Sequence, residues 1–279
     1  NLPEPLGKRS VEAEALSAEV RFPERNHADL TVKLERGLLA QLEFASRDDR
    51  WRFERGAAGL NTPPPVYKGA GGLVVSGVVE QLDLGAWTAA FAEPNVAAGA
   101  APAASGGRTR WQDYFDRMDL DIGELTALGY RFPDVVLGAG FMANAWEVDL
   151  AGPSLSGRLQ VPYDFVASER IDFDMRRLLL VDGVRSPAVK GDENPYSPLD
   201  LPAIRGTADE FALGTLRFGS LEADIERTPR GLQSRVLVTR SPSFSVQVAG
   251  DWLVIDNAQR SRLRVEMNST DMEQTLRTL

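Results

Sequence analysis

Apolar and polar residues alternate along short runs of the chain, and this period-2 pattern constrains the fold more than any other feature of the sequence. Leu30, Val32 and Leu34, for example, are separated by Thr31 and Lys33. Successive side chains of a β-strand point to opposite faces, so each run places its apolar residues on one face and its polar residues on the other. Roughly 17 such runs, separated by Gly, Pro, Asn or Asp turn signals, predict a mostly β protein with a meandering antiparallel sheet.

Three stretches depart from this pattern, because their apolar residues recur at the spacing of one helical face. We expect each of them to form a short amphipathic helix at an edge of the sheet. Thr270 and Glu273 form a capping box at the start of the last one. The apolar residues that predict these helices are Leu84, Trp87 and Phe91, then Trp111, Phe115 and Met118, and finally Met272, Leu276 and Leu279.

The composition excludes several classes of function. A net charge of −9 and an isoelectric point near 4.9 argue against nucleic acid or an anionic bilayer surface as a partner, because both repel an acidic protein. The absence of cysteine removes disulfides, thiol catalysis and thiolate metal sites together. No stretch approaches the ~20 apolar residues that span a bilayer, so we expect any membrane anchor to lie outside this sequence.

Stretches rich in Gly, Pro and Ala, which interrupt the strand pattern, predict how the chain is organised. We expect residues 1–183 to form a first β segment of repeat units, with a mobile Ala/Gly/Pro-rich loop at about residues 92–108. Residues 184–202 are expected to be a linker loop, and residues 203–279 a further β repeat unit that continues the same sheet.

Weak internal repetition supports this organisation. The segment from Leu128–Gly129 to Pro162 resembles the segment from Leu213–Gly214 to Trp252, since each has a Leu-Gly turn, a strand, a loop and two more strands. Units of this kind bury their apolar face only by stacking on their neighbours.

Catalytic and metal-binding patterns are weak. His27 is the single histidine and lies in a polar stretch, so no triad can be built around it. Phosphate-loop, nucleophile-elbow and zinc-protease motifs are all missing. The acidic groups at Asp119 with Asp121, and at Asp192 with Glu193, lack the spacing of a calcium loop. The sequence therefore predicts a protein that is not an enzyme and that uses no metal and no cofactor.

Several short motifs resemble the AsmA-like envelope proteins, in particular their YhdP branch. The resemblance extends over nearly the whole chain, although each motif is short. The family's amino-terminal membrane helix and its final carboxy-terminal region do not appear in this sequence, which would make it an interior to carboxy-terminal segment. The motifs are Gly72 to Gly77, Leu82 to Leu84 with Trp87, Leu201 to Ile204, the positions Ala208, Phe211, Leu216, Gly219 and Leu221, and the turn Thr228 to Leu232.

This resemblance implies a periplasmic protein that is anchored in the inner membrane by a segment outside this sequence. It implies an elongated, curled, largely antiparallel sheet that forms an open groove, with a few short edge helices. The apolar inside of the groove would conduct the acyl chains of phospholipids toward the outer membrane, supporting its permeability barrier. The partners implied are phospholipids, the inner membrane, and the outer membrane or its proteins, with no nucleic acid.

No catalytic residue is carried over from the family, so the candidate site consists of apolar residues whose alternation points them to one face. The candidate residues that line the groove are Leu30, Val32, Leu34, Leu42, Phe44, Val75, Trp146, Val148, Leu150, Leu159, Val161, Phe173, Leu221, Ile225, Val236, Val238, Phe244, Val246, Val248, Leu263 and Val265.

The same alternation is compatible with a second fold and function. A closed β-sandwich would place these apolar residues on its two inner faces, and its loops would serve binding or adhesion. The residues would be identical in both cases, and only the openness of the apolar face would differ. Phospholipid that co-purifies with the chain would favour the conduit over the sandwich.

Overall fold

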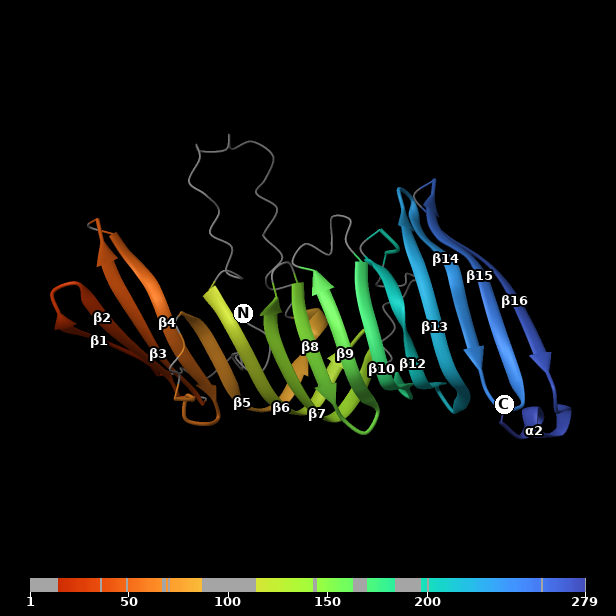
Figure 1. Ribbon diagram of the computed structural model, residues 1–279, viewed down its shortest axis with the longest axis horizontal. Coiled ribbons are helices and arrows are strands. Elements are labelled where there is room, and N and C mark those ends of the chain that lie inside the picture. Colours follow the sequence, from red (N-terminus) through yellow and green to blue (C-terminus); the bar gives the residue numbers. More distant parts are fainter. Residues whose placement is uncertain are drawn as a thin grey trace. The chain divides into compact units, whose positions relative to one another are not determined.

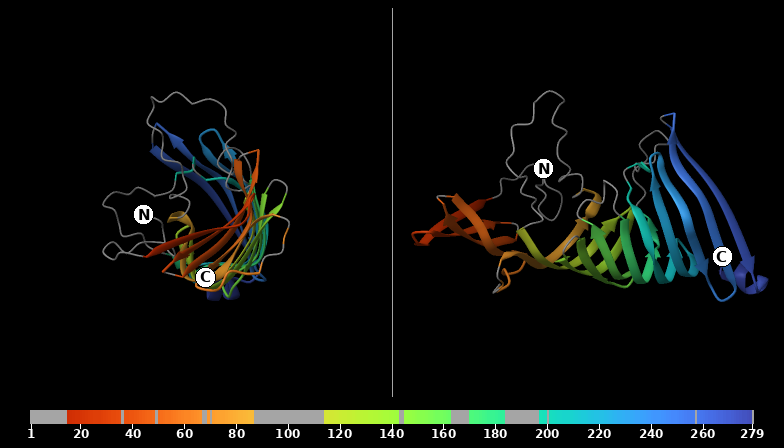
Figure 2. Two further views of the ribbon diagram at one scale, coloured as in Figure 1. Left: turned by 90° about the vertical axis from the view of Figure 1, so that its left-hand side faces the viewer. Right: turned by 45° about the horizontal axis from the view of Figure 1, so that its top comes forward.

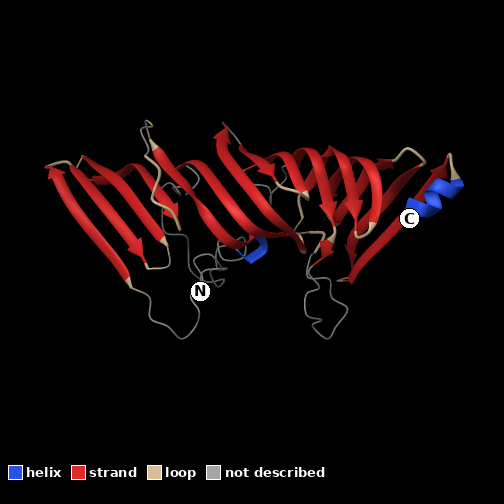
Figure 3. Ribbon diagram, turned by 90° about the horizontal axis from the view of Figure 1, so that it is seen from below, coloured by secondary structure: helices blue, strands red, loops and turns tan. Residues whose placement is uncertain are grey.

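The computed structural model describes residues 15–35, 37–48, 50–66, 69, 71–86, 114–142, 145–162, 170–183, 197–199, 201–256 and 258–278. Most of these residues lie in strands (Figure 3). Every described strand belongs to one sheet, in which β1 to β10 and then β12 to β16 follow one another in chain order (Figure 1). Strand β11 lies off this path and pairs with β7. The first and last strands of this order are not joined, so the sheet is open. The predicted mostly β fold with an open sheet is confirmed.

The chain divides into two compact units, and the division falls within strand β7. The first unit comprises residues 1–128 and 136–141. Its strands are β1 (Leu16–Glu24), β2 (His27–Leu34), β3 (Leu38–Arg47), β4 (Arg50–Leu60), β5 (Gly72–Asp83), β6 (Phe115–Ala127) and the second part of β7 (Tyr130–Met142).

The second unit comprises residues 129–135 and 142–279. Its strands lie side by side in one layer, as Figure 2 shows for β12 to β16. They are the first part of β7, then β8 (Ala145–Ala151), β9 (Leu155–Pro162), β10 (Arg170–Leu180), β11 (Asp182–Gly183), β12 (Ala203–Leu213), β13 (Leu216–Thr228), β14 (Gly231–Arg240), β15 (Phe244–Ile255) and β16 (Ala258–Ser269).

The sheet is not antiparallel throughout. The pairs β4/β5, β5/β6 and β10/β12 are parallel, whereas the remaining pairs with a known register are antiparallel. Two parallel neighbours require a connection that returns along the whole strand. The expectation of a simple meander is therefore corrected at these three places.

The return connection from β4 to β5 crosses the sheet on one definite face. Gly59 registers with Leu39 and Ser76, on the face opposite to Ala58. A Cβ on Gly59 would overlap the carbonyl oxygen of Thr62 and would lie 2.7 Å from the backbone of Pro63. The connection therefore passes directly over Gly59 at residues 62–64.

This close approach predicts that Gly59→Ala destabilises the first unit. We expect a loss of about 1–3 kcal/mol in the free energy of unfolding, because the added methyl group meets backbone atoms that cannot rotate away. Gly140→Ala is the matched control, since a Cβ at Gly140 has nothing within 4 Å. Denaturant titration of the two variants measures the difference. Equal midpoints would show that the connection does not press on Gly59.

The two Leu-Gly turns of the repeated segments share positive φ at their glycines but differ at their leucines, since Leu128 has φ 51° and Leu213 belongs to β12. Leu128–Gly129 connects β6 with β7, and Leu213–Gly214 connects β12 with β13. Gly129 and Gly214 both have positive φ, at 79° and 60°, and five residues after each glycine a second residue with positive φ follows. These second residues are Asp134, with φ 51°, and Gly219, with φ 77°.

The carboxy-terminal helix is confirmed as α2 (Met272–Thr278), but its cap differs from the expected one. The backbone N–H of Gln274 donates to Oδ1 of Asp271 at 3.0 Å, so Asp271 caps the helix. The Thr270 hydroxyl instead donates to the carbonyl oxygen of Ser243 at 3.2 Å. The buried Thr275 hydroxyl lies 3.2 Å from the same oxygen, which fixes α2 to the turn between β14 and β15.

The structure describes only some residues of the other two expected helices. Residues 84–86 are helical, whereas Trp87, Phe91 and Trp111 lie outside the described residues, as does the loop at 92–108. The helix through Phe115 and Met118 is wrong, because both residues belong to β6 and register with β5. The expected linker at 184–202 is described only at 197–199 and 201–202, and β10 and β12 on either side of it are paired with each other.

Candidate functional site

The register of the second unit separates two faces of different chemistry. Side chains that register with one another across strands lie on the same face of the sheet. We call one face the second apolar face. It consists of Trp146, Val148, Leu150, Gly157, Leu159, Val161, Ile171, Phe173, Met175, Ile204, Gly206, Ala208, Leu221, Ala223, Ile225, Leu232, Ser234, Leu237, Thr239, Phe244, Val246, Val248, Gly250, Trp252, Val254, Gln259, Ser261, Leu263, Val265, Met267 and Ser269.

Charge is almost excluded from this face. The charged residue that continues it, among those in register, is Arg227 at the end of β13, whose guanidinium donates to the carbonyl oxygen of Leu199. The hydroxyl of Ser234 donates to the carbonyl oxygen of Val248 at 3.2 Å, so it is satisfied within the sheet. The face therefore presents hydrocarbon along eight consecutive neighbours in the order of the sheet, β8 to β16 without β11.

The opposite face of the second unit holds the ion pairs. Nε of Arg158 lies 2.9 Å from both Oε1 of Glu147 and Oδ1 of Asp149. The hydrogen bond to Asp149, and then the charge of that carboxylate, raise the pKa of Arg158 above its usual value. Arg177 and Glu210 form a further pair across β10 and β12. These pairs are exposed and contribute little stability each, but they show which face meets water.

The first unit is divided in the same way. Its polar face holds the pair of Arg55 with Glu43 at 2.6 Å, and that of Arg117 with Asp119 at 2.6 Å. We call the other side the first apolar face, and the charged residue that continues it in register is Glu124, which pairs with Gln81 beyond Ile122. This face consists of Leu16, Ala18, Val20, Ala28, Leu30, Val32, Leu34, Leu38, Ala40, Leu42, Phe44, Gly56, Ala58, Leu60, Leu73, Val75, Gly77, Val79, Met118, Leu120 and Ile122.

Glycines on the apolar faces let large neighbouring side chains lie against the backbone. A Cβ on Gly206 would lie 2.6 and 2.7 Å from two ring carbons of Phe173, its register partner on β10. A Cβ on Gly56 would lie 2.6 Å from Cδ2 of Leu42. The larger side chain thus occupies the place that a side chain on the glycine would take, and it covers backbone polar groups with hydrocarbon.

Aromatic rings cluster in both units. In the second unit, the ring of Phe218 has its centroid 5.8 Å from that of Phe211 and 6.3 Å from that of Phe244. In the first unit, Phe53 lies 5.8 Å from Phe44 in an edge-to-face arrangement. Such ring pairs add stability beyond the area that they bury.

Nineteen of the candidate lining residues fall on these two faces by register. That they line a groove for a ligand stays a prediction. On the first apolar face lie Leu30, Val32, Leu34, Leu42, Phe44 and Val75. On the second apolar face lie Trp146, Val148, Leu150, Leu159, Val161, Phe173, Leu221, Ile225, Phe244, Val246, Val248, Leu263 and Val265.

Val236 and Val238 lie on the other face, contrary to the expectation from alternation. They register with Asp224 and Glu222, on the polar side. The register shifts between β13 and β14 at this level, because Arg235 is an extra residue in β14. Beyond the shift, the apolar face continues through Leu237 and Thr239 instead.

The sequence pattern also missed the small members of both faces. Ala40, Ala58 and Ala208 are buried and register among the large apolar residues. Alanine and glycine are weak signals of apolar alternation, so only the register of their partners identifies them. One feature of the sequence does indicate that two of these alanines lie on an apolar face: Ala40 and Ala58 are each two residues from a large apolar residue on the same strand.

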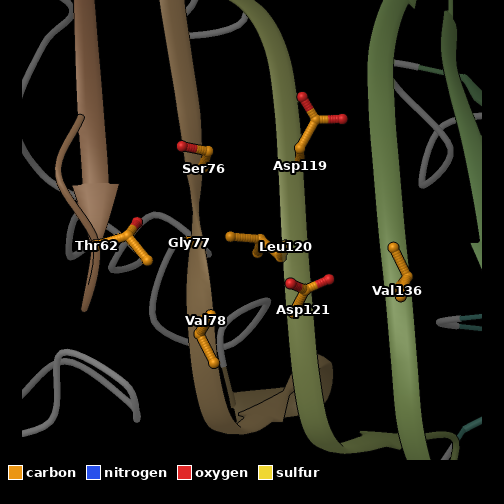
Figure 4. A pocket seen from close by; sticks show the side chains of 8 residues that line it. All are labelled: Thr62, Ser76, Gly77, Val78, Asp119, Leu120, Asp121 and Val136. Atoms are coloured by element: carbon orange, nitrogen blue, oxygen red, sulfur yellow. The ribbon is translucent and has the colours of Figure 1, made fainter. Parts of the chain in front are cut away.

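A shallow pocket opens beside the first unit's polar face (Figure 4). Thr62, Ser76, Gly77, Val78, Asp119, Leu120, Asp121 and Val136 line it. Arg117 donates to Asp119, and this hydrogen bond raises the pKa of Arg117 above its usual value. No group of three or more His, Cys, Asp or Glu side chains in the described part of the chain could hold a metal ion. The pocket therefore offers two carboxylates, one of them already paired with a guanidinium.

The single histidine has an ordinary surface environment. Nδ1 of His27 lies 3.5 Å from a carboxylate oxygen of Glu24, and half of its side chain is exposed. Among the helices of the described residues, none is both long enough and apolar enough to cross a membrane.

Comparison with known proteins gives one family. The family model described as YhdP protein matches residues 1–279. Neither the curated proteins nor the solved structures contain a significant match to the chain.

Proposed function

The chain belongs to the YhdP family, and from this premise we propose that it is a segment of a phospholipid conduit whose two apolar faces hold acyl chains. Membership of the family suggests bridge-like lipid transport. The observation that carries the proposal is that each unit has one face made mainly of apolar residues, with charge only toward its end at Glu124 or Arg227, while the ion pairs lie on the other face. The proposed role is non-catalytic and requires no cofactor.

The energetics of lipid transfer support a continuous apolar surface. Moving two acyl chains of ~30 methylenes into water costs on the order of 20 kcal/mol, at ~0.8 kcal/mol per methylene. A surface that accepts hydrocarbon along its whole length removes most of this barrier. On the second apolar face, side chains such as Phe173, Val246 and Val248 are only half-buried, so they have hydrocarbon surface left to offer.

The alternative of a β-sandwich is less well supported. A sandwich buries its apolar residues between two sheets packed face to face. All of the described strands follow one another in a single sheet, and no second described sheet packs against either apolar face. A binding or adhesion module would also need its function on loops, whereas the conspicuous feature here is the face of the sheet.

We further propose the location and the partners that the family implies. The conduit would lie in the periplasm and would be held at the inner membrane by an anchor outside this sequence. It would pass phospholipid to the outer membrane or to proteins there, and so support the permeability barrier. The net charge of −9 is consistent with a ligand bound through its acyl chains rather than through an anionic surface.

Lipid that stays with the purified chain tests the proposal. We expect native mass spectrometry of the chain, produced in bacteria and purified without detergent, to show added masses of phospholipid. Solvent extraction and chromatography should identify the same lipids. The control is the chain unfolded in urea, stripped of lipid and refolded, which should take up phospholipid again from vesicles. A refolded chain that takes up none would contradict the proposal.

A further inference from the structure

The outer edge of strand β16 is open. All twelve residues of β16, Ala258–Ser269, are exposed, and no described strand pairs with it on the side away from β15. Its apolar side chains register onto the second apolar face yet remain largely in water: Leu263 is 62% exposed and Val265 60%. An unpaired edge of this kind can accept another strand through its backbone N–H and C=O groups.

A row of arginines runs along the polar side of the same strand. Arg260, Arg262 and Arg264 alternate with the apolar residues and therefore lie on one face, about 6.7 Å apart. Asp251 is the register partner of Arg262, whereas Arg260 and Arg264 register with uncharged residues. None of the three guanidiniums is within ion-pair distance of a described carboxylate.

This row contrasts with other arginines of the sheet. Arg158, Arg177 and Arg240 each reach a carboxylate on their own or an adjacent strand. On β16 the equivalent carboxylates are missing on the open side, where the next strand would lie. Three arginines in a row on this edge strand thus lack the carboxylate partner that Arg158, Arg177 and Arg240 have.

We propose that the edge of β16 binds a β-strand from a partner, in which acidic residues alternate with apolar ones. Its carboxylates would lie beside Arg260, Arg262 and Arg264, and its apolar residues would lie beside Leu263 and Val265. The added strand would form backbone hydrogen bonds with β16 and would widen the second apolar face. This inference does not depend on what that face carries.

Two other occupants fit less well. A second copy that paired through its own β16 in a register centred on Arg262 would place arginines beside arginines, and like charges in adjacent strands repel. A register centred on Val265 would place Arg264 beside Glu266 of the other copy, but would leave Arg260 and Arg262 without a carboxylate. A second copy that paired through β1 would offer Glu19 together with Arg21 on its polar side, so their charges offset each other. An anionic bilayer would satisfy the arginines alone, leaving the backbone edge and the apolar side chains without partners.

A labelled peptide of alternating valine and glutamate tests the proposal on the whole chain by fluorescence anisotropy. We expect it to bind about tenfold more tightly than the same peptide with lysine in place of glutamate, from three exposed charge pairs. A peptide of equal composition with its valines and glutamates in separate blocks should bind weakly. Amides of β16 should become protected from hydrogen exchange when the alternating peptide is bound.

Charge reversal separates recognition from misfolding. The triple variant Arg260→Glu, Arg262→Glu and Arg264→Glu should prefer the lysine peptide, and this peptide should protect the amides of β16 from hydrogen exchange, which non-specific attraction to an unfolded acidic chain does not do. Equal affinity of the native chain for both alternating peptides would overturn the proposal. So would binding of the chain to vesicles of phosphatidylglycerol that depends on the three arginines, if the glutamate peptide does not compete for it.

Discussion

Replacing Leu125 with alanine is expected to lower the free energy of unfolding of the first unit by about 2–5 kcal/mol. Leu125 is 1% exposed, and it registers with Leu82 in the parallel pair of β5 and β6. Val79 and Ile122 on the same two strands are also fully buried. Deleting the leucine side chain therefore removes buried hydrocarbon and leaves a cavity that strands held in register cannot easily close.

Leu128→Ala is the control for this prediction, because it removes the same atoms three residues away. Leu128 is 72% exposed in the turn after β6, so its loss should change stability by no more than about 0.5 kcal/mol. Urea denaturation followed by circular dichroism compares the two variants. If Leu125→Ala and Leu128→Ala unfold at the same urea concentration, the parallel pair of β5 and β6 is not a core of the first unit.

Alternation predicted the strands because it is a local property of the chain. Residues 263–267, for example, show both their strand conformation and their apolar face without reference to any other segment. The three parallel pairs were not predictable in this way, because the partner of a strand depends on where a long connection returns. Phe115 and Met118 show the resulting error: their spacing resembles a helix, but pairing with β5 decides their conformation.

The apolar faces were predictable wherever a strand keeps its register from end to end. Val246 and Val248 lie where alternation placed them, since β15 pairs with β16 without a shift. Val236 and Val238 do not, because one extra residue at Arg235 exchanges the two faces of β14. A bulge changes no local preference of the sequence, so only the pairing of the neighbouring strands reveals it.

The second large effect that we expect is on lipid binding, from Val246→Asp. Val246 registers with Thr239 and Met267 in the second apolar face and is half-buried. A carboxylate there would meet the acyl chains without a partner, at a cost of about 1–3 kcal/mol or more. The affinity for phospholipid should therefore fall by about tenfold or more, as measured by retention of native lipid and by uptake from vesicles.

Gln247→Asp provides the matched control, because it introduces the same carboxylate on the adjacent residue. Gln247 is exposed on the polar face, where it registers with Val238 and Glu266. Its variant should keep its lipid, and both variants should melt close to the native chain, since an open face lets the new charge at position 246 remain partly hydrated. In a closed sandwich, Val246→Asp would instead bury an unpaired charge and unfold the protein, so that no cooperative melting transition would be seen. Equal lipid retention by two folded variants would contradict the conduit, because the new charge would then act no differently on the two faces.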